Sequence, residues 1–289
     1  MRSQRDESSD AKGDTRASRP PPWVPLLRRL TDLSSLWGVW KNADQAIDVS
    51  GDIDSVSDPA DRAVLLQEFA RWATKNDMAP IIVCSHLPGS VLSVAIRDGH
   101  ELVELQLCEQ AIFRGSTLFT AEELRPLMVM DPRGFRRLRA GSEGLLLLFH
   151  NSMGRGGVSL LEGEKARRPL ELMRSDPDGA EAATAVFGQV RKHARGVAVA
   201  ALEGRWNRRA AVVVEAWAIA RAFSGPRLFA ARARYRMNNA RCTLLPALRG
   251  GRYLRGNIDE WLARVLKMHE RAGSPASDPV KNRSKRGGG

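Results

Sequence analysis

Hydrophobic and polar residues alternate or cluster in short runs through the first 110 positions, which is typical of β-strands rather than helices. The clearest run is 101–108 ("ELVELQLC"), where Val103, Leu105 and Leu107 fall on one face and Glu104 falls on the other. A polar stretch, 41–51 ("KNADQAIDVSG"), indicates a loop. The predicted strands are residues 36–40, 52–56, 79–86, 90–96 and 101–108.

Apolar residues at helical spacing predict helices in the rest of the chain. One helix follows the second strand, where Asp58 is placed to cap it and Pro59 to occupy its first position. Further along, Thr120 and Glu123 form a capping-box pattern, and Ser142 is a candidate cap. The predicted helices are residues 57–76, 120–128, 141–157, 176–194, 207–223 and 257–273.

This order of elements predicts an α+β protein, with a small mixed β-sheet domain followed by a mainly helical C-terminal region. Both ends of the chain are rich in charged residues, Pro, Ser and Gly, and we expect them to be disordered. The expected divisions are a disordered tail at 1–22, the α/β domain at 23–120, the helical domain at 121–271 and a disordered basic tail at 272–289.

The 289 residues, 43% of them hydrophobic, are enough to bury a sizeable core. No apolar run reaches the roughly 18 residues that a membrane span needs, and the charged N-terminus lacks the apolar segment of a secretory signal. The three cysteines, Cys84, Cys108 and Cys242, have no metal-ligand spacing and leave one unpaired. We therefore expect reduced cysteines and a cytoplasmic protein without a membrane span.

The net charge of +12 is distributed unevenly along the chain. Residues 23–190 carry 18 Lys and Arg against 23 Asp and Glu, whereas residues 191–271 carry 18 against 5. Such a basic half indicates a polyanionic partner, which the charge alone leaves as a nucleotide, a nucleic acid or an anionic membrane surface. The alternative is a set of arginine-rich, solvated helices that bind no such partner.

An acidic pair, Asp52 and Asp54, flanks a single isoleucine in the second predicted strand ("DIDSV"). Side chains two apart on a strand point to the same face, so the two carboxylates repel each other unless a cation lies between them. Glu104 falls on the polar face of the strand 101–108, which we expect to pair beside them. Three converging carboxylates suit two-metal phosphoryl transfer, and Mg²⁺ prefers such hard oxygen ligands.

The order of "SGDIDSV", a capped helix and a later acidic strand ("VELQL") resembles the nucleotidyltransferase superfamily of the DNA polymerase beta type. With "WGVWKN", "FRGSTLF" and "LRAGSEGLLLLFH", roughly residues 36–155 look like nucleotidyltransferase-like proteins of bacterial polysaccharide and small-molecule pathways. The resemblance implies a mixed sheet backed by helices. It also implies that Asp52, Asp54 and Glu104 are catalytic residues and ligands of Mg²⁺, with Mn²⁺ as an alternative ion. The family reaction transfers a nucleoside monophosphate from a triphosphate to a hydroxyl or phosphate acceptor.

The sequence departs from this family where a Gly-Ser pair usually precedes the acidic pair and holds the triphosphate. Here the chain has "VWKNADQ", and the nearby Ser50–Gly51 comes directly before Asp52. Lys41 is a candidate to place a point charge on phosphate instead, although its presence is equally compatible with weak or absent triphosphate binding. Ser50, Gly51 and Arg114 are further candidate substrate contacts, against the alternatives of a tight turn and a surface arginine.

Two functions therefore fit the sequence. The first is a Mg²⁺-dependent nucleotidyltransferase acting on a nucleoside triphosphate and an acceptor that the sequence does not name. The second is a non-catalytic module of the same fold that binds RNA or another polyanion through basic residues 205–255. Mg²⁺-dependent pyrophosphate release is expected of the first, and salt-sensitive binding that needs no acidic pair is expected of the second.

Overall fold

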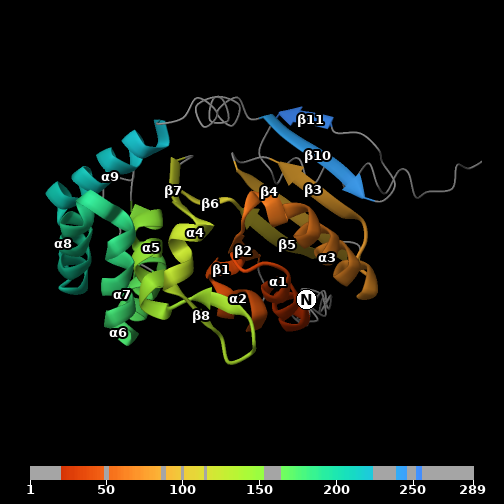
Figure 1. The fold of residues 1–289 in the computed structure, drawn as a ribbon, viewed down its shortest axis with the longest axis horizontal. Coiled ribbons are helices and arrows are strands. Elements are labelled where there is room, and N and C mark those ends of the chain that lie inside the picture. The colour runs from red at the N-terminus through yellow and green to blue at the C-terminus, as the bar shows by residue number, and fades with distance from the viewer. Residues whose placement is uncertain are drawn as a thin grey trace, which may run out of the picture.

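A computed structural model describes most of the chain, and the statements below concern its described residues. These are residues 21–48, 52–85, 89–98, 101–113, 116–152, 164–223, 239–245 and 252–255. The fold is mixed α/β, with one large mixed sheet and several helices packed around it (Figure 1). The predicted mixture of strands and helices is confirmed at this level, and the domain boundaries stay predictions.

The large sheet has the strand order β11-β10-β3-β4-β5-β2-β1-β9-β8. Strands β2 and β5 at its centre run parallel, whereas β1–β2, β3–β4 and β4–β5 are antiparallel. In chain order, the first seven strands of this sheet are β1 Gly38–Lys41, β2 Ile53–Val56, β3 Ile81–Ser85, β4 Ser90–Arg97, β5 Glu101–Cys108, β8 Met128–Met130 and β9 Arg136–Leu138. Strands β10 Asn239–Leu245 and β11 Arg252–Arg255 extend it beyond β3, and β6 Gln110–Phe113 and β7 Ser116–Thr120 form a separate hairpin.

The helices fall into two groups along the chain. The first group is α1 Trp23–Leu33, α2 Ala43–Asp48 and α3 Arg62–Lys75, preceded by the 3₁₀ turn η1 Pro59–Asp61. The second group is α4 Ala121–Leu124, η2 Arg125–Leu127, α5 Ala140–Ser152, α6 Glu164–Ser175, α7 Pro177–Ala183, η3 Thr184–Val190, α8 Arg191–Leu202 and α9 Arg208–Phe223. The predicted helix at 257–273 lies outside the described residues.

Several local predictions are confirmed in this framework. Asp58 caps η1, since its side chain accepts a hydrogen bond of 2.7 Å from the Ala60 backbone N–H. Thr120 and Glu123 form the predicted capping box, although the helix that follows is a single turn. Ser142 was predicted wrongly as a cap. Helix α5 already begins at Ala140, and the Ser142 hydroxyl instead donates a 2.8 Å hydrogen bond to a carbonyl of α7.

Three further features of the structure differ from what the sequence led us to expect. The stretch 41–51, expected to be a loop, contains the short helix α2, whose Ala43 and Ala46 are buried against the sheet. Helix α1 was not predicted, although Trp23, Leu26, Leu27 and Leu30 have helical spacing and are all buried. After residue 120 the chain also returns to the sheet through β8, β9, β10 and β11.

The sheet separates two hydrophobic cores. Helices α1 and α3 cover one face, where Trp37, Ile53 and Leu105 pack beneath them. The other core joins Val56 and Cys108 to the second group of helices. Within it, Gly144 of α5 lets α6 approach so closely that a Cβ atom there would stand 2.7 Å from the Pro169 carbonyl oxygen. Helices α1 and α3 therefore cover one face of the sheet with apolar side chains. A polar site at the centre of the sheet has to lie on the opposite face.

None of the helices in the described part of the chain combines the length and the apolar character that crossing a membrane requires.

Candidate functional site

The acidic pair lies on β2, which runs antiparallel to β1. A bulge between Val39 and Lys41 shifts the register of these strands, so that Lys41 stands opposite Asp54. The Lys41 Nζ atom lies 3.0 Å from the Asp54 Oδ2 atom and 5.0 Å from the centre of the Trp40 ring. The cation that the acidic pair requires is therefore provided, in this structure, by the side chain of Lys41.

Asp54 and its neighbour Asp52 differ sharply in exposure. Asp54 is 3% exposed, whereas Asp52, directly before the strand, is exposed. Burial raises the pKa of the Asp54 carboxyl; Lys41 lowers it, Asp52 raises it further, and the net shift is upward. One lysine thus compensates the buried charge only in part, and the acidic pair retains a deficit of positive charge.

Glu104 lies on the same face of the sheet as Asp54. Strands β2 and β5 pair in parallel with Asp54 opposite Gln106 and Ile53 opposite Leu105, and residues paired in this way point to the same side. Leu105 is buried in the core under α1 and α3, so Glu104 and Gln106 on either side of it point to the opposite face. The predicted pairing of the two strands is present, and the third carboxylate lies one strand away from the acidic pair.

The fit of these residues to Mg²⁺ depends on how many carboxylates the ion needs. Among the described residues, no group of three or more His, Cys, Asp or Glu side chains is placed to hold a metal ion. Asp52 and Asp54 nevertheless suit Mg²⁺, because this ion commonly takes one or two carboxylates and fills its other positions with water and substrate phosphates. The partly compensated charge of buried Asp54 supports the same fit.

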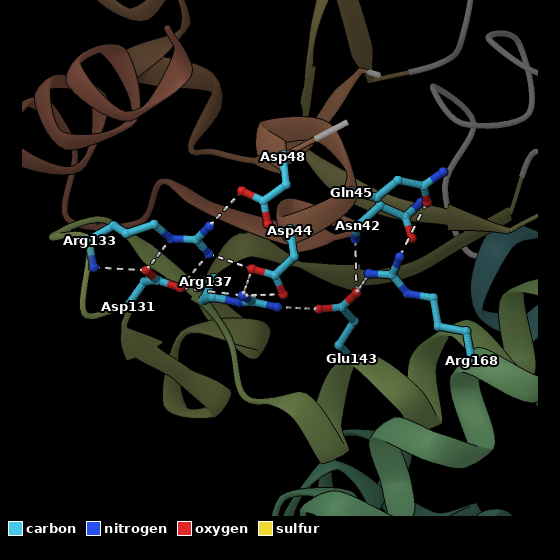
Figure 2. A network of polar contacts seen from close by, with 9 residues as sticks. All are labelled: Asn42, Asp44, Gln45, Asp48, Asp131, Arg133, Arg137, Glu143 and Arg168. Atoms are coloured by element: carbon cyan, nitrogen blue, oxygen red, sulfur yellow. Dashed lines mark hydrogen bonds and ion pairs between the residues drawn. The ribbon is translucent and has the colours of Figure 1, made fainter. Parts of the chain in front are cut away.

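A second cluster of charged side chains lies between α2, the β8–β9 hairpin, α5 and α6 (Figure 2). We call it the arginine–carboxylate network, and its members are Asp44, Asp48, Asp131, Arg133, Arg137, Glu143 and Arg168. Arg137 lies at its centre and contacts three carboxylates, those of Asp44 at 2.8 Å, Glu143 at 3.1 Å and Asp131 at 3.3 Å. The network thus ties together four elements that are distant in sequence.

Glu143 of α5 connects this network to the acidic pair. It is 1% exposed and accepts hydrogen bonds from the Asn42 backbone N–H at 2.9 Å, from Arg137 at 3.1 Å and from Arg168 at 3.1 Å. Asn42 directly follows Lys41 and has a φ of 58°, a left-handed conformation that Asn adopts more readily than most residues. Glu143 therefore fixes the turn from which Lys41 reaches the acidic pair.

The arginines lower the pKa values of the aspartates in the network. The hydrogen bond from Arg133 is the largest cause for Asp131, whose pKa falls to about 2. Burial raises the pKa of Asp44, but the hydrogen bonds from Arg137 and Arg133 outweigh it, and the net shift is downward. Both aspartates are therefore stabilised in their ionised form, which is the opposite of the situation at Asp54.

The structure brings together some of the residues that the sequence predicts for the site. Lys41 pairs with Asp54, Asp52 interacts electrostatically with Asp54, and Glu104 lies on the same face of the sheet as Asp54. The predicted substrate contacts Ser50, Gly51 and Arg114 lie outside the described residues.

The arginine–carboxylate network is not predicted from the sequence. The available signal is the run 131–140 ("DPRGFRRLRA"), which has four arginines in ten residues. Apart from Asp131 within the run, the carboxylates that Arg133 and Arg137 contact lie elsewhere in the chain, on α2 and α5. The pairing therefore needed the tertiary fold.

In comparisons with known proteins, no family model, no curated protein and no solved structure matched this chain. The resemblance to the nucleotidyltransferase superfamily accordingly depends on the residues of "SGDIDSV", "VELQL" and their flanking segments. The assignment of a function stays a proposal.

Proposed function

We propose that this protein is a Mg²⁺-dependent nucleotidyltransferase that moves a nucleoside monophosphate from a nucleoside triphosphate to an acceptor hydroxyl or phosphate. The observation that carries the proposal is the parallel pairing of β2 with β5, by which Asp54 and Glu104 share one face of the sheet. The partly compensated charge of Asp54 supports it, since perturbed carboxyls are common at catalytic sites.

Each side chain has a role in this proposal. Asp52 and Asp54 would hold Mg²⁺, which supplies the charge that neutralises the triphosphate. Lys41 pairs with Asp54, and its flexible four-carbon stem would let the ammonium turn to a phosphate oxygen. Glu104, on the neighbouring strand, would accept the proton of the acceptor hydroxyl. Glu143 is a positioning residue, since it acts through the Lys41–Asn42 turn.

Pyrophosphate release from each of the four nucleoside triphosphates tests the proposal, measured with Mg²⁺, with Mn²⁺ and with excess chelator. We expect release with at least one triphosphate, dependence on the divalent ion and loss in Asp54→Asn. Asp32→Asn is the matched control, because Asp32 is an exposed aspartate on α1. Absence of release under every condition, together with no Mn²⁺ binding to the purified protein, would sink the enzymatic proposal.

The ion pair between Lys41 and Asp54 favours a second candidate function. A lysine that pairs with the buried carboxylate and partly compensates its charge takes over part of the role of a metal ion. The protein would then be a non-catalytic module of the same fold, binding a polyanion through its basic half. In that case Mn²⁺ binds no better to the wild-type protein than to Asp54→Asn, and polyanion binding is the same in both.

A further inference from the structure

A groove on α8 and α9 is not explained by the proposed reaction. Its volume is about 640 Å³, and the side chains that line it come from both helices and from the turn between them. We call it the basic groove; the residues that matter here are Lys192, Arg195, Arg205, Trp206, Arg208 and Arg209. Figure 1 places α8 and α9 at one end of the molecule, away from β2 in its middle.

The positive charge of this groove is not balanced by the protein itself. Glu203 is the one carboxylate among the residues that line it, and it pairs with Arg205. Lys192, Arg208 and Arg209 are exposed, and their side chains have no hydrogen bond or ion pair with the described residues. Three uncompensated cations around one groove attract an anion.

The first turn of α9 adds to this excess. Arg208 and Arg209 begin that helix, and no acidic residue stands in its first turn. Cations at the positive end of a helix dipole are unfavourable on their own, and an anion bound beside them relieves the repulsion. The exposed cations and the helix end therefore favour the same kind of ligand.

The shape of the groove indicates a chain rather than a single phosphate. Its wall on α8 extends from Lys192 to Glu203, which is about 16 Å at 1.5 Å per residue. The wall also includes Trp206, which is only partly buried, with part of the side chain packed on the core. A positively charged groove with an aromatic side chain is the usual arrangement for binding a single strand, because phosphates pair with the cations and a base stacks on the ring.

We propose that the basic groove binds single-stranded nucleic acid, with the phosphates at Lys192, Arg208 and Arg209 and a base against Trp206. This inference does not depend on the proposed reaction, because none of these residues belongs to the acidic pair or to the arginine–carboxylate network. It assigns nucleic-acid binding to α8 and to the start of α9, which overlaps the predicted basic region 205–255 only at its N-terminal end.

Fluorescence anisotropy with a labelled 12-nucleotide single-stranded RNA and the full-length protein tests this proposal. In the double variant Lys192→Gln/Arg209→Gln, which removes one cation from each helix, we expect binding at 50 mM salt to weaken about tenfold or more. The slope of log K against log salt should become shallower by about 1.4, since each lost phosphate contact removes about 0.7 for a single strand. The matched control Lys75→Gln/Arg125→Gln removes the same charge from exposed residues elsewhere and should change both values little.

Each other outcome overturns the proposal. Equal weakening in the control pair means that binding follows net charge alone, and unchanged binding in the groove variant means that the strand binds elsewhere. A mononucleotide or inorganic phosphate that competes as well as the RNA assigns the groove to a small phosphorylated ligand instead. The Asp54→Asn variant should bind the RNA as the wild type does, although it should lose pyrophosphate release. Failure of the proposed reaction and failure of the proposed RNA binding can therefore be told apart.

Discussion

The acidic pair and the arginine–carboxylate network use the same kinds of residue to opposite effect. In the network, Asp131 and Asp44 accept hydrogen bonds from arginines, and their pKa values fall. At the acidic pair, buried Asp54 has Lys41 as its cation, and its pKa rises. In the first region the arginines more than offset the cost of burying the aspartates, whereas in the second region Lys41 offsets the burial of Asp54 only in part.

This difference separates the region for which we propose chemistry from the region to which we assign a structural role. A carboxylate saturated with arginine gains little from a ligand, because its lone pairs and charge are already satisfied. A buried carboxylate with partial compensation binds an added cation favourably. The two regions also meet at one place, since Glu143 of the network holds the Asn42 N–H beside Lys41. The following predictions test whether their roles are in fact separate.

The largest expected effect is on turnover at the acidic pair. Asp54→Asn removes a proposed metal ligand whose charge stabilisation is worth several kcal/mol in the transition state, so we expect turnover to fall about a thousandfold or more. The melting temperature should change little, because burial already disfavours the charged form of Asp54 and the Lys41 ammonium that loses its partner is partly exposed to solvent. Steady-state pyrophosphate release and thermal unfolding of the same preparation provide the two readouts. A large loss of stability without a specific loss of turnover would assign Asp54 to the fold.

The next effect is on stability, and it belongs to the network. Glu143→Ala leaves Arg137, Arg168 and the Asn42 N–H without their buried acceptor, so we expect the free energy of unfolding to fall by about 3 to 5 kcal/mol. Urea denaturation measures this change. Glu171→Ala is the control, because Glu171 pairs with Arg167 on the exposed surface of α6, and it should cost no more than about 1 kcal/mol. Similar losses in both variants would contradict the structural role of the network.

A smaller effect is expected where the two regions meet. Lys41→Gln removes the ammonium that competes with a metal ion for Asp54, so we expect Mn²⁺ to bind up to about tenfold more tightly, the equivalent of about 1.4 kcal/mol. Isothermal titration calorimetry in the absence of nucleotide measures the affinity. Turnover should fall in the same variant, since the proposed phosphate contact is lost. Weaker Mn²⁺ binding would show that Lys41 supports the metal site rather than occupying it.

The smallest effect concerns stability in acid, and the two regions should respond in opposite directions. The pKa values of Asp131 and Asp44 are lower in the folded protein, so their ionised forms stabilise the fold above about pH 4. That contribution should be lost as the pH falls from about 4 towards 2, the folded pKa of Asp131. Asp54 has a raised pKa, so its stabilising contribution is present below about pH 4 and is lost as the pH rises through its folded value.

Urea denaturation between pH 5 and pH 2.5 separates these contributions. Asp131→Asn should flatten the loss of stability in acid, because one of the groups responsible is gone. Asp54→Asn should make the same loss slightly steeper, because the opposing group is gone. Identical pH profiles for wild type and both variants would contradict the difference between the two regions.

The sequence by itself determined local features of the chain, namely the faces of a strand and the caps of helices. The alternation in "ELVELQLC" separated Glu104 from Val103 and Leu105, because a strand turns each successive side chain over, and Glu104 shares its face of the sheet with Asp54. The caps at Asp58 and Thr120 were likewise local, since each bonds a backbone N–H within three residues.

The partners were decided only by tertiary structure. Because of the bulge in β1, Lys41 rather than Trp40 lies opposite Asp54. Helix α2 formed in a stretch whose polar composition indicates a loop. Glu143 reaches Asn42 across 101 positions of the chain. Such contacts depend on the sum of many packing interactions, which no short window of sequence contains, and they determine whether a buried charge is satisfied or left available for a ligand.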